Sequence, residues 1–263
     1  MRNRFIHPSP VDDEYLITRL RRDDLRVLVN RDLPKSSNAV VLDFGSRTSP
    51  YKDLFNGKIK KFLMADLVSS GQKHVDVDIR PDGTLNMPDG SVDVVLSLQV
   101  LEHVENIDTH LSEAKRVLKP GGLLWLTTHG MWAYHPTPDD YHRWTLAGLR
   151  RIIGQHFDIT DTSALMGGPA FAVMIYINLL LLFTRKINSL QSKILNTLTR
   201  SQRWGKSGES PNKIKSPYWY LGSNLFLILV VPMNIIMTII DRLTPDPSKR
   251  SQAAVFRVTA KKH

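Results

Sequence analysis

The sequence contains no cysteine among its 263 residues, which excludes a disulfide framework and thiolate metal sites. Its first ten residues lack an apolar core long enough for a secretory signal peptide. Internal repeats and extended low-complexity tracts are also absent. These absences favour a cytosolic catalytic part.

The sequence is also short of glycine where a dinucleotide-binding protein needs it. Ala39 to Leu42 is a continuous apolar run, typical of a parallel strand covered on both faces, and Asp43 to Ser49 supplies turn residues. A dinucleotide fingerprint reads Gly-x-Gly-x-x-Gly, whereas residues 45–50 read Gly-Ser-Arg-Thr-Ser-Pro. A dehydrogenase is therefore disfavoured.

An acidic residue nevertheless stands at the place expected for a nucleotide-like ligand. The second predicted strand, Phe62 to Ala65, ends at Asp66, 21 residues after Gly45. In a mononucleotide-binding half, this is the position of the acid that binds the ribose hydroxyls.

Further along the chain, strand and helix patterns alternate. Val92 to Leu98 has the pattern of a buried strand, and Leu123 to Thr128 that of the next. Between them lies a predicted helix, with apolar residues at helical spacing from Ile107 to Leu118, which residues 119–122 end. Such alternation predicts a parallel sheet.

The ends of the chain add three elements to this prediction. Asp12 to Val29 is predicted as a leading helix that packs on the sheet. Phe157 to Thr160 and Ala254 to Ala260 are predicted as the sixth and seventh strands.

From Val40 to Phe157 the chain resembles the class I S-adenosylmethionine-dependent methyltransferases, and within them the type 11 methyltransferase domain. The segments Asp89 to Val104 and Glu113 to Gly122 carry the resemblance most specifically. It implies an α/β, Rossmann-like fold with a mostly parallel seven-stranded sheet, an antiparallel last strand and S-adenosylmethionine as cofactor.

The resemblance also implies roles for the strand ends, where this fold binds its ligand. Asp43 would orient the glycine loop, and Gly45 with Ser46 would line the methionine part of the cofactor. Asp66 would accept hydrogen bonds from the ribose. The remaining implied contacts are Asp78 and Ile79 beside the adenine, with Gln99 and Val100 closing the far side.

Each of these assignments has a structural alternative. Asp43 or Asp66 would equally serve to cap a helix or satisfy loop amides, and Asp76 competes with Asp78 on the same strand face. Arg47 stands where the family has glycine; if that position requires positive φ, strain there favours a non-catalytic member.

The loop after the fifth strand is the predicted acceptor site, because it gathers titratable and aromatic side chains from His129 to Thr145. It resembles a stretch of type 11 proteins encoded among cell-surface polysaccharide genes, which implies a sugar acceptor. The matching residues are His135, Pro138, Asp140, Tyr141, Arg143 and Thr145.

The candidate bases for a hydroxyl acceptor are His103, His135 and Asp140. In the alternative interpretation Thr145 caps the helix Leu146 to Ile153, Arg143 pairs with Asp139 or Asp140, and the histidines only hold the loop. A metal site is disfavoured, because no His-x-x-x-His or His-Glu-x-x-His spacing occurs.

The predicted organisation is a methyltransferase domain of residues 1–166 and 250–263, in which 1–35 holds the leading helix, and a helical, apolar C-terminal insertion of 167–249. Two apolar runs dominate the insertion, Ala170 to Phe183 and Leu221 to Ile240. The first is short for a membrane span and Pro232 interrupts the hydrogen-bond ladder of the second.

The sequence between these runs has eight basic residues against the single acid Glu209, and it supplies most of the formal net charge of +10. Full crossings would place this loop against the positive-inside tendency. A hairpin lying on anionic headgroups is therefore expected, with Tyr218, Trp219 and Tyr220 at the boundary. A buried helical subdomain or a dimer interface is the alternative, which leaves homo-oligomerisation open.

Nucleic acid is disfavoured as a partner, because the basic residues are not interleaved with aromatic ones along a groove. The predicted function is methyl transfer from S-adenosylmethionine to a sugar hydroxyl of a lipid-linked or cell-surface glycan precursor, on the inner face of the membrane. A prenyl-quinone or other lipid methyltransferase is the alternative within the enzymes. The alternative outside them is an inactive, membrane-associated binding or scaffold protein.

Overall fold

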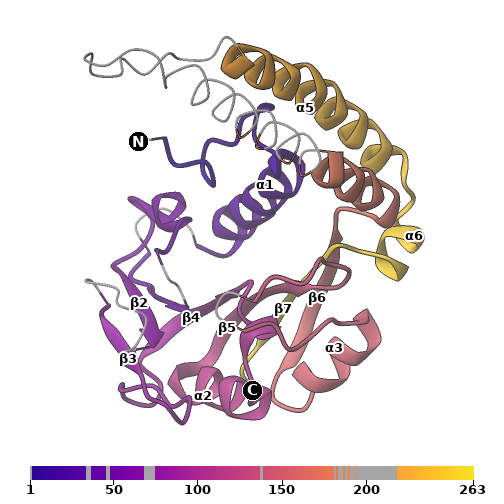
Figure 1. Ribbon diagram of the computed structural model, residues 1–263. Helices are drawn as coiled ribbons and strands as arrows, with labels where there is room; N and C mark the ends of the chain where they lie inside the picture. The colour runs from indigo at the N-terminus through magenta and orange to yellow at the C-terminus, as the bar shows by residue number, and fades with distance from the viewer. Residues whose placement is uncertain are drawn as a thin grey trace, which may run out of the picture.

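The computed structural model describes most of the chain, as helices arranged around a central sheet (Figure 1). The described residues are 2–33, 37–45, 48–67, 75–136, 139–180 and 218–263, together with 182, 186, 189 and 193. Side chains at 218–228, 247, 248 and 250 are excluded from this description.

Seven strands of the described chain form one sheet in the order β3-β2-β1-β4-β5-β7-β6. Neighbours from β1 to β5 pair in parallel, and β7 pairs antiparallel with both β5 and β6. This confirms the predicted mostly parallel sheet with an antiparallel last strand. The strands are β1 (Val40–Phe44), β2 (Lys61–Leu67), β3 (Val77–Ile79), β4 (Val92–Leu98), β5 (Leu118–His129), β6 (Asp158–Leu165) and β7 (Val255–Lys261).

Strands β5 and β6 exceed their predicted lengths most, because a partner strand supplies their hydrogen bonds. β5 begins at Leu118, so residues 119–122, predicted to separate helix and strand, lie within the strand and pair toward the C-terminus through Gly121 N and Lys262 O, 3.0 Å apart. β6 extends to Leu165 because β7 pairs with it up to that residue.

Helices cover both faces of the sheet (Figure 1). On one face lies α1 (Tyr15–Asp32), whose Leu25 and Leu28 are buried in one cluster with Trp125 of β5. On the other face lie α2 (Ile107–Val117) and α3 (Leu146–Ile153), which contribute to the main apolar cluster. The leading helix and its packing on the sheet are as predicted, with bounds shifted by three residues.

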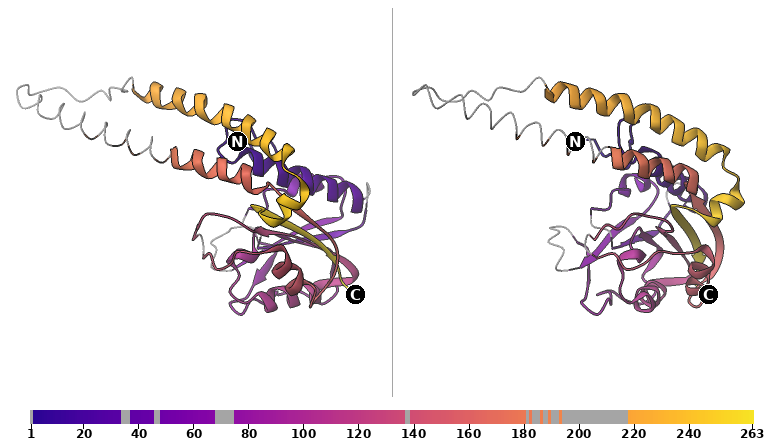
Figure 2. Two further views of the ribbon diagram at one scale, coloured as in Figure 1. Left: turned by 90° about the vertical axis from the view of Figure 1, so that its right-hand side faces the viewer. Right: turned by 45° about the vertical axis from the view of Figure 1, so that its right-hand side comes forward.

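Further helices stand between β6 and β7 in the chain. They are a helical segment over residues 168–180, α5 (Tyr218–Leu243) and α6 (Asp246–Ser251). The segment and α5 run side by side over α1 (Figure 2), and all three share one buried cluster. The predicted separate unit of 167–249 remains a prediction. Helix α6 crosses its boundary at residue 249, and these helices share their core with α1.

Helix α5 continues through Pro232, so the missing N–H interrupts its ladder without ending it. Near this point the buried Asn234 donates its amide to the carbonyl oxygens of Pro10 and Asp12, at 2.7 and 3.0 Å. These bonds tie α5 to the N-terminal segment. Within the described part of the chain, none of the helices has both the length and the apolar content that crossing a membrane requires.

The start of α3 provides a test of the local fold. Thr145 Oγ1 accepts a hydrogen bond from Gly148 N at 3.1 Å, which confirms the predicted cap. We expect Thr145→Ala to lower the free energy of unfolding by about 1 kcal/mol, measured by urea denaturation. Thr145→Ser keeps the hydroxyl and should retain most of that stability; equal losses in both variants would contradict the capping role.

Candidate functional site

The predicted cofactor contacts stand at one edge of the sheet, because parallel strands bring their carboxyl ends together. Gly45 follows β1, Asp66 lies near the end of β2, and Gln99 follows β4. The register pairs Leu42 with Leu63 and Asp43 with Leu96, which sets these three strand ends level. Ser46 and Arg47 lie outside the described residues.

Gly45 is required by a close approach of two loops. Its φ is +83°, and a Cβ at this position would lie 2.7 Å from Cγ1 of Val100. Its N–H donates to the carbonyl of Ala65 at 2.9 Å, which holds the loop against β2. The space beside Val100 therefore admits only glycine at position 45.

Asp43 is a buried carboxyl group that accepts a hydrogen bond from the loop after β1. Its Oδ2 accepts a hydrogen bond from Ser49 Oγ at 2.9 Å, and Ser49 itself has a positive φ of 44°. Burial raises the pKa of Asp43 to about 7, the Ser49 hydrogen bond opposes this, and the nearby Asp66 raises it further. Ser49 thus occupies a strained conformation that its hydrogen bond helps to stabilise.

Asp66 presents a free acceptor at this edge. The residue is 7% exposed; its Oδ1 accepts from Leu67 N at 2.8 Å, and its buried Oδ2 has no hydrogen-bond partner in the described structure. A buried carboxylate oxygen without a partner is costly unless a ligand supplies donors. The hydroxyl groups of a ribose are donors of the right kind.

The structure gives fewer contacts for the residues predicted to flank the adenine. Asp78 pairs in register with Asp66 and is exposed, whereas Ile79 is buried. The competing Asp76 accepts a hydrogen bond from Met64 N through Oδ2 at 2.9 Å, which gives it a structural role. Asp78 is thus the acid of the two that remains available to a ligand.

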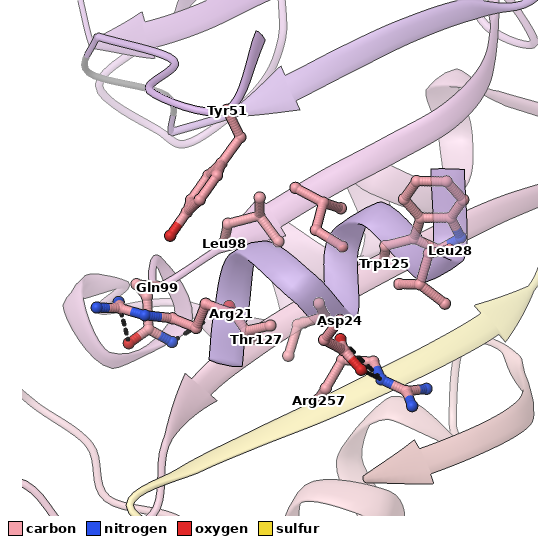
Figure 3. Close-up of a pocket in the computed structure, with 11 residues that line it drawn as sticks. Arg21, Asp24, Leu28, Tyr51, Leu98, Gln99, Trp125, Thr127 and Arg257 are labelled. Carbon is pink, nitrogen blue, oxygen red and sulfur yellow. Dashed lines mark hydrogen bonds and ion pairs between the residues drawn. The ribbon is translucent and has the colours of Figure 1, made fainter. Parts of the chain in front are cut away.

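A small cavity lies between α1 and the ends of β4 and β5, lined by Arg21, Tyr51 and Gln99 among others (Figure 3). It measures about 20 Å³, room for about one water molecule. A guanidinium N–H of Arg21 donates to Gln99 Oε1 at 3.3 Å, and Gln99 Nε2 donates to Thr127 Oγ1 at 3.2 Å. Gln99 has a positive φ of 59°, rare for a residue with a side chain and a common mark of functional sites.

Two polar atoms at this cavity are buried without partners in the described structure, Arg21 Nε and the Tyr51 hydroxyl. Burial also raises the pKa of Tyr51. Neither residue was predicted from the sequence as a site residue. Arg21 belongs to a series of arginines on an amphipathic helix and looks like a solvated side chain, and only the packing of α1 brings it to the strand ends.

The predicted catalytic residues meet around a buried glutamate. His103 and Glu102 belong to the short 3₁₀ helix η3 (Leu101–His103), His129 ends β5, and His135 lies in the loop that follows. The ring of His135 lies 5.0 Å, centroid to centroid, from that of His103 and from that of His129. The His129 ring stacks on Trp132 at 4.6 Å.

Glu102 is fully buried, and its Oε2 accepts a hydrogen bond from Thr128 Oγ1 at 2.9 Å. Its Oε1 lies 3.1 Å from His129 Nδ1, without the alignment of a hydrogen bond. Burial raises the pKa of Glu102 and lowers that of His129 far below its ordinary value. The His129 ring is therefore neutral, and Glu102 is a functional candidate that the sequence analysis did not assign.

The two predicted histidine bases have their ring tautomers set by backbone oxygens. His103 Nδ1 donates to the carbonyl of Asp139, and His135 Nδ1 donates to the carbonyl of Ala133 at 3.2 Å. In a neutral ring this arrangement leaves Nε2 with a lone pair. Each side chain is therefore able to accept a proton from a nearby hydroxyl group.

Asp140 has a structural role that removes it from this set. Its two carboxylate oxygens accept hydrogen bonds from Arg143, at 2.5 and 2.6 Å, and Oδ2 also accepts from His135 N at 2.9 Å. The Arg143 hydrogen bonds hold the pKa of Asp140 far below its usual range. The sequence-based pairing of Arg143 with Asp140 is confirmed, and a carboxylate so held is a poor base at neutral pH.

The structure also brings together potential metal-ligating side chains that show no metal-ligand spacing in the sequence. Metal-ligating atoms of Glu102, His103 and His135 all lie within 4.8 Å of one another. These residues come from two segments that are distant in sequence, so local spacing does not reveal their convergence. The absence of a metal requirement stays a prediction.

Comparison with known proteins gives a consistent result. Residues 61–126 match the family model described as a methyltransferase domain. A probable S-adenosylmethionine-dependent methyltransferase of Mycolicibacterium smegmatis is 42% identical over 146 residues, which is 50% of this chain and 57% of that protein. A ubiquinone biosynthesis O-methyltransferase of Brucella melitensis is 35% identical over 63 residues, which is 23% of this chain and 25% of that protein.

The chain thus spans between a quarter and about half of the length of these curated relatives. Among solved structures, a S-adenosylmethionine-dependent methyltransferase from Aquifex aeolicus has 16% identity and a TM-score of 0.43, covering 57% of this chain and 92% of its own. The [4+2]-cyclase SpnF has 17% identity and a TM-score of 0.48, covering 91% and 80%. Likeness at this level adds nothing on substrate or chemistry.

The raised pKa of Asp43 predicts a pH dependence of stability. Because the folded-state pKa, about 7, exceeds the value of 3.8 for the free side chain, the folded state binds this proton more tightly than the unfolded chain does. The contribution favours folding below about pH 4 and is lost as the pH rises to about 7, a change on the order of 4 kcal/mol.

Asp43→Asn removes this titration while keeping the shape of the side chain. We expect the stability of the variant relative to the natural chain to rise between about pH 4 and pH 7, measured by urea unfolding at several pH values. The other titrating groups are common to both chains and cancel in the difference. Parallel pH profiles for the two chains would contradict the assignment.

Proposed function

Because the chain carries a class I S-adenosylmethionine-dependent methyltransferase domain, we propose that it transfers a methyl group from S-adenosylmethionine to a hydroxyl group of a sugar. The proposed acceptor is a lipid-linked or cell-surface glycan precursor. The observation that carries the proposal is the partnerless carboxylate oxygen of Asp66, at the same sheet edge as the cluster of Glu102, His129 and His135.

The residues at this edge fit the cofactor. Asp66 Oδ2 would accept hydrogen bonds from the ribose hydroxyls, and Gly45 with Ser46 would line the methionine part. Gln99 with Val100 would close one side, and Asp78 with Ile79 would flank the adenine. S-adenosylmethionine supplies an electrophilic methyl group on a sulfonium centre.

Arg21 is a further contact that we assign to the cofactor. Its guanidinium bonds only to the neutral amide of Gln99, and no carboxylate of the described chain lies within ion-pair distance of it. Arg21 is half-buried, and a cation partly removed from water is unfavourable without a counter-charge. The carboxylate of the cofactor's amino-acid part would supply that charge, with the nearby Tyr51 hydroxyl as a second donor.

Methyl transfer from a sulfonium is an in-line displacement, so the chain mainly has to hold the acceptor oxygen in line with the methyl group. Such alignment is worth up to roughly 7–11 kcal/mol in ideal cases. His103 or His135 would accept the proton of the acceptor hydroxyl at Nε2. Asp140, fixed by Arg143, would hold the backbone of His135 in place.

A quinone or other lipid acceptor is the second candidate within the enzymes. It is favoured by the similarity to a protein named for ubiquinone biosynthesis, over residues that make up 23% of this chain. The loop from His135 to Thr145 favours the sugar acceptor. A catalytically inactive binding or scaffold protein is the remaining candidate, and cofactor binding with methyl transfer distinguishes it from both enzymes.

The role of Asp66 is tested by donor binding. Hydrogen bonds to a charged group are worth about 1.5–3 kcal/mol each, so we expect Asp66→Ala to weaken the binding of S-adenosylmethionine by roughly tenfold or more in isothermal titration. Asp53→Ala removes an exposed carboxylate of the short helix after β1 and serves as the matched control. Equal affinities for the two variants would refute the cofactor site.

The roles of the histidines are tested by turnover with labelled methyl donor and separate glycan-precursor and quinone extracts. A positioned base contributes about 10²–10⁴-fold, so we expect His103→Ala or His135→Ala to lower kcat by that factor with donor affinity unchanged. Asp140→Asn should lower kcat less, through the position of His135. Full turnover in both histidine variants would leave neither as the base, and label in the quinone fraction alone would select the second candidate.

A further inference from the structure

Two helices that follow β6 expose large apolar side chains to solvent. On the helical segment that begins at residue 168, and on α5, these side chains form what we call the apolar face. Its members, with their exposed fractions, are Tyr176 (58%), Leu179 (59%), Leu182 (59%), Ile235 (55%), Ile236 (44%), Ile239 (51%) and Leu243 (76%).

The apolar face is distinct from the sides of the helices that form the core. Apart from the adjacent Ile235 and Ile236, its members recur every three or four residues, so they follow one side of each helix. The buried Ile177 and Met237 lie between them in sequence and pack in one cluster with Leu16 and Ile17 of α1. The core accounts for the inner sides and leaves the outer sides uncovered, a pattern that marks an interaction surface.

Exposed basic residues flank the apolar face, with the exposed acid Asp246 near its end at Leu243. Lys186 lies four residues beyond Leu182 and is exposed, and Arg242 is exposed beside Leu243. The sequence that joins the two helices carries eight basic residues and one acidic residue between 184 and 217. An apolar stripe flanked by basic residues is complementary to a surface with an apolar interior and anionic headgroups.

We propose that the apolar face docks on the surface of an anionic membrane. The side chains of Leu179, Leu182 and Ile239 enter the boundary between headgroups and acyl chains, and the neighbouring lysines and arginines contact the anionic headgroups. A second copy of the chain is the competing occupant, and it fits less well. Each copy carries a surplus of positive charge in the sequence that joins the two helices, so charge favours an anionic surface over a second, equally basic copy.

The proposal is independent of the acceptor and of catalysis. It is tested by flotation of the full chain with vesicles of phosphatidylcholine and phosphatidylglycerol, against vesicles of phosphatidylcholine alone. We expect binding to the anionic vesicles, weaker binding to the neutral ones, and a decrease at high salt. Binding to neither kind of vesicle, or equal binding to both kinds, would overturn the proposal.

The double variant Leu179→Asp with Ile239→Asp tests the face itself. Both side chains are more than half exposed, so the core is not altered; we expect the vesicle-bound fraction to fall about tenfold or more. Gln155→Asp adds a negative charge at an exposed position after α3 and should leave binding unchanged. Retained affinity for S-adenosylmethionine shows that each variant is folded.

Light scattering on the same proteins distinguishes the second copy. If the natural chain is a dimer that the double variant converts to a monomer, and vesicle binding is unaffected, the face is a dimer interface and the membrane proposal is wrong. A monomer whose vesicle binding is lost in the double variant, and kept in Gln155→Asp, supports it.

Discussion

The level alignment of the carboxyl ends of β1, β2 and β4 is the constraint on which the site depends. Parallel pairing sets Asp43 beside Leu96 and Asp66 beside Asp78, so groups far apart in sequence share one edge. Because each strand turns into a loop at that edge, backbone and carboxylate groups face a ligand together. Gly45 keeps the edge open, since any larger residue would collide with Val100.

The site also depends on polar groups held away from water. Asp43 and Glu102 are buried carboxyl groups whose pKa values burial raises, and His129 is a buried imidazole whose pKa burial lowers. Each of these shifts favours the neutral form of the group over the charged one. Asp66 adds to this interior a buried carboxylate oxygen, Oδ2, that has no hydrogen-bond partner in the described structure.

Local sequence patterns predicted much of the fold. β4 and α3 have the predicted bounds, because apolar periodicity and the Thr145 cap are properties of neighbouring residues. β6 was predicted too short, since its later residues are polar and only the pairing with β7 defines them as strand. Arg21, Tyr51 and Glu102 were missed as site residues for a related reason, because packing between distant segments brings them to the strand ends.

The place of β7 in the sheet has a consequence for how the chain acquires its structure. β7 lies between β5 and β6, yet it follows every other strand in the sequence. Until β7 is synthesised, β6 has no neighbour to pair with and the edge of β5 stays open. The sheet is therefore complete only once β7, near the end of the chain, has paired with both β5 and β6.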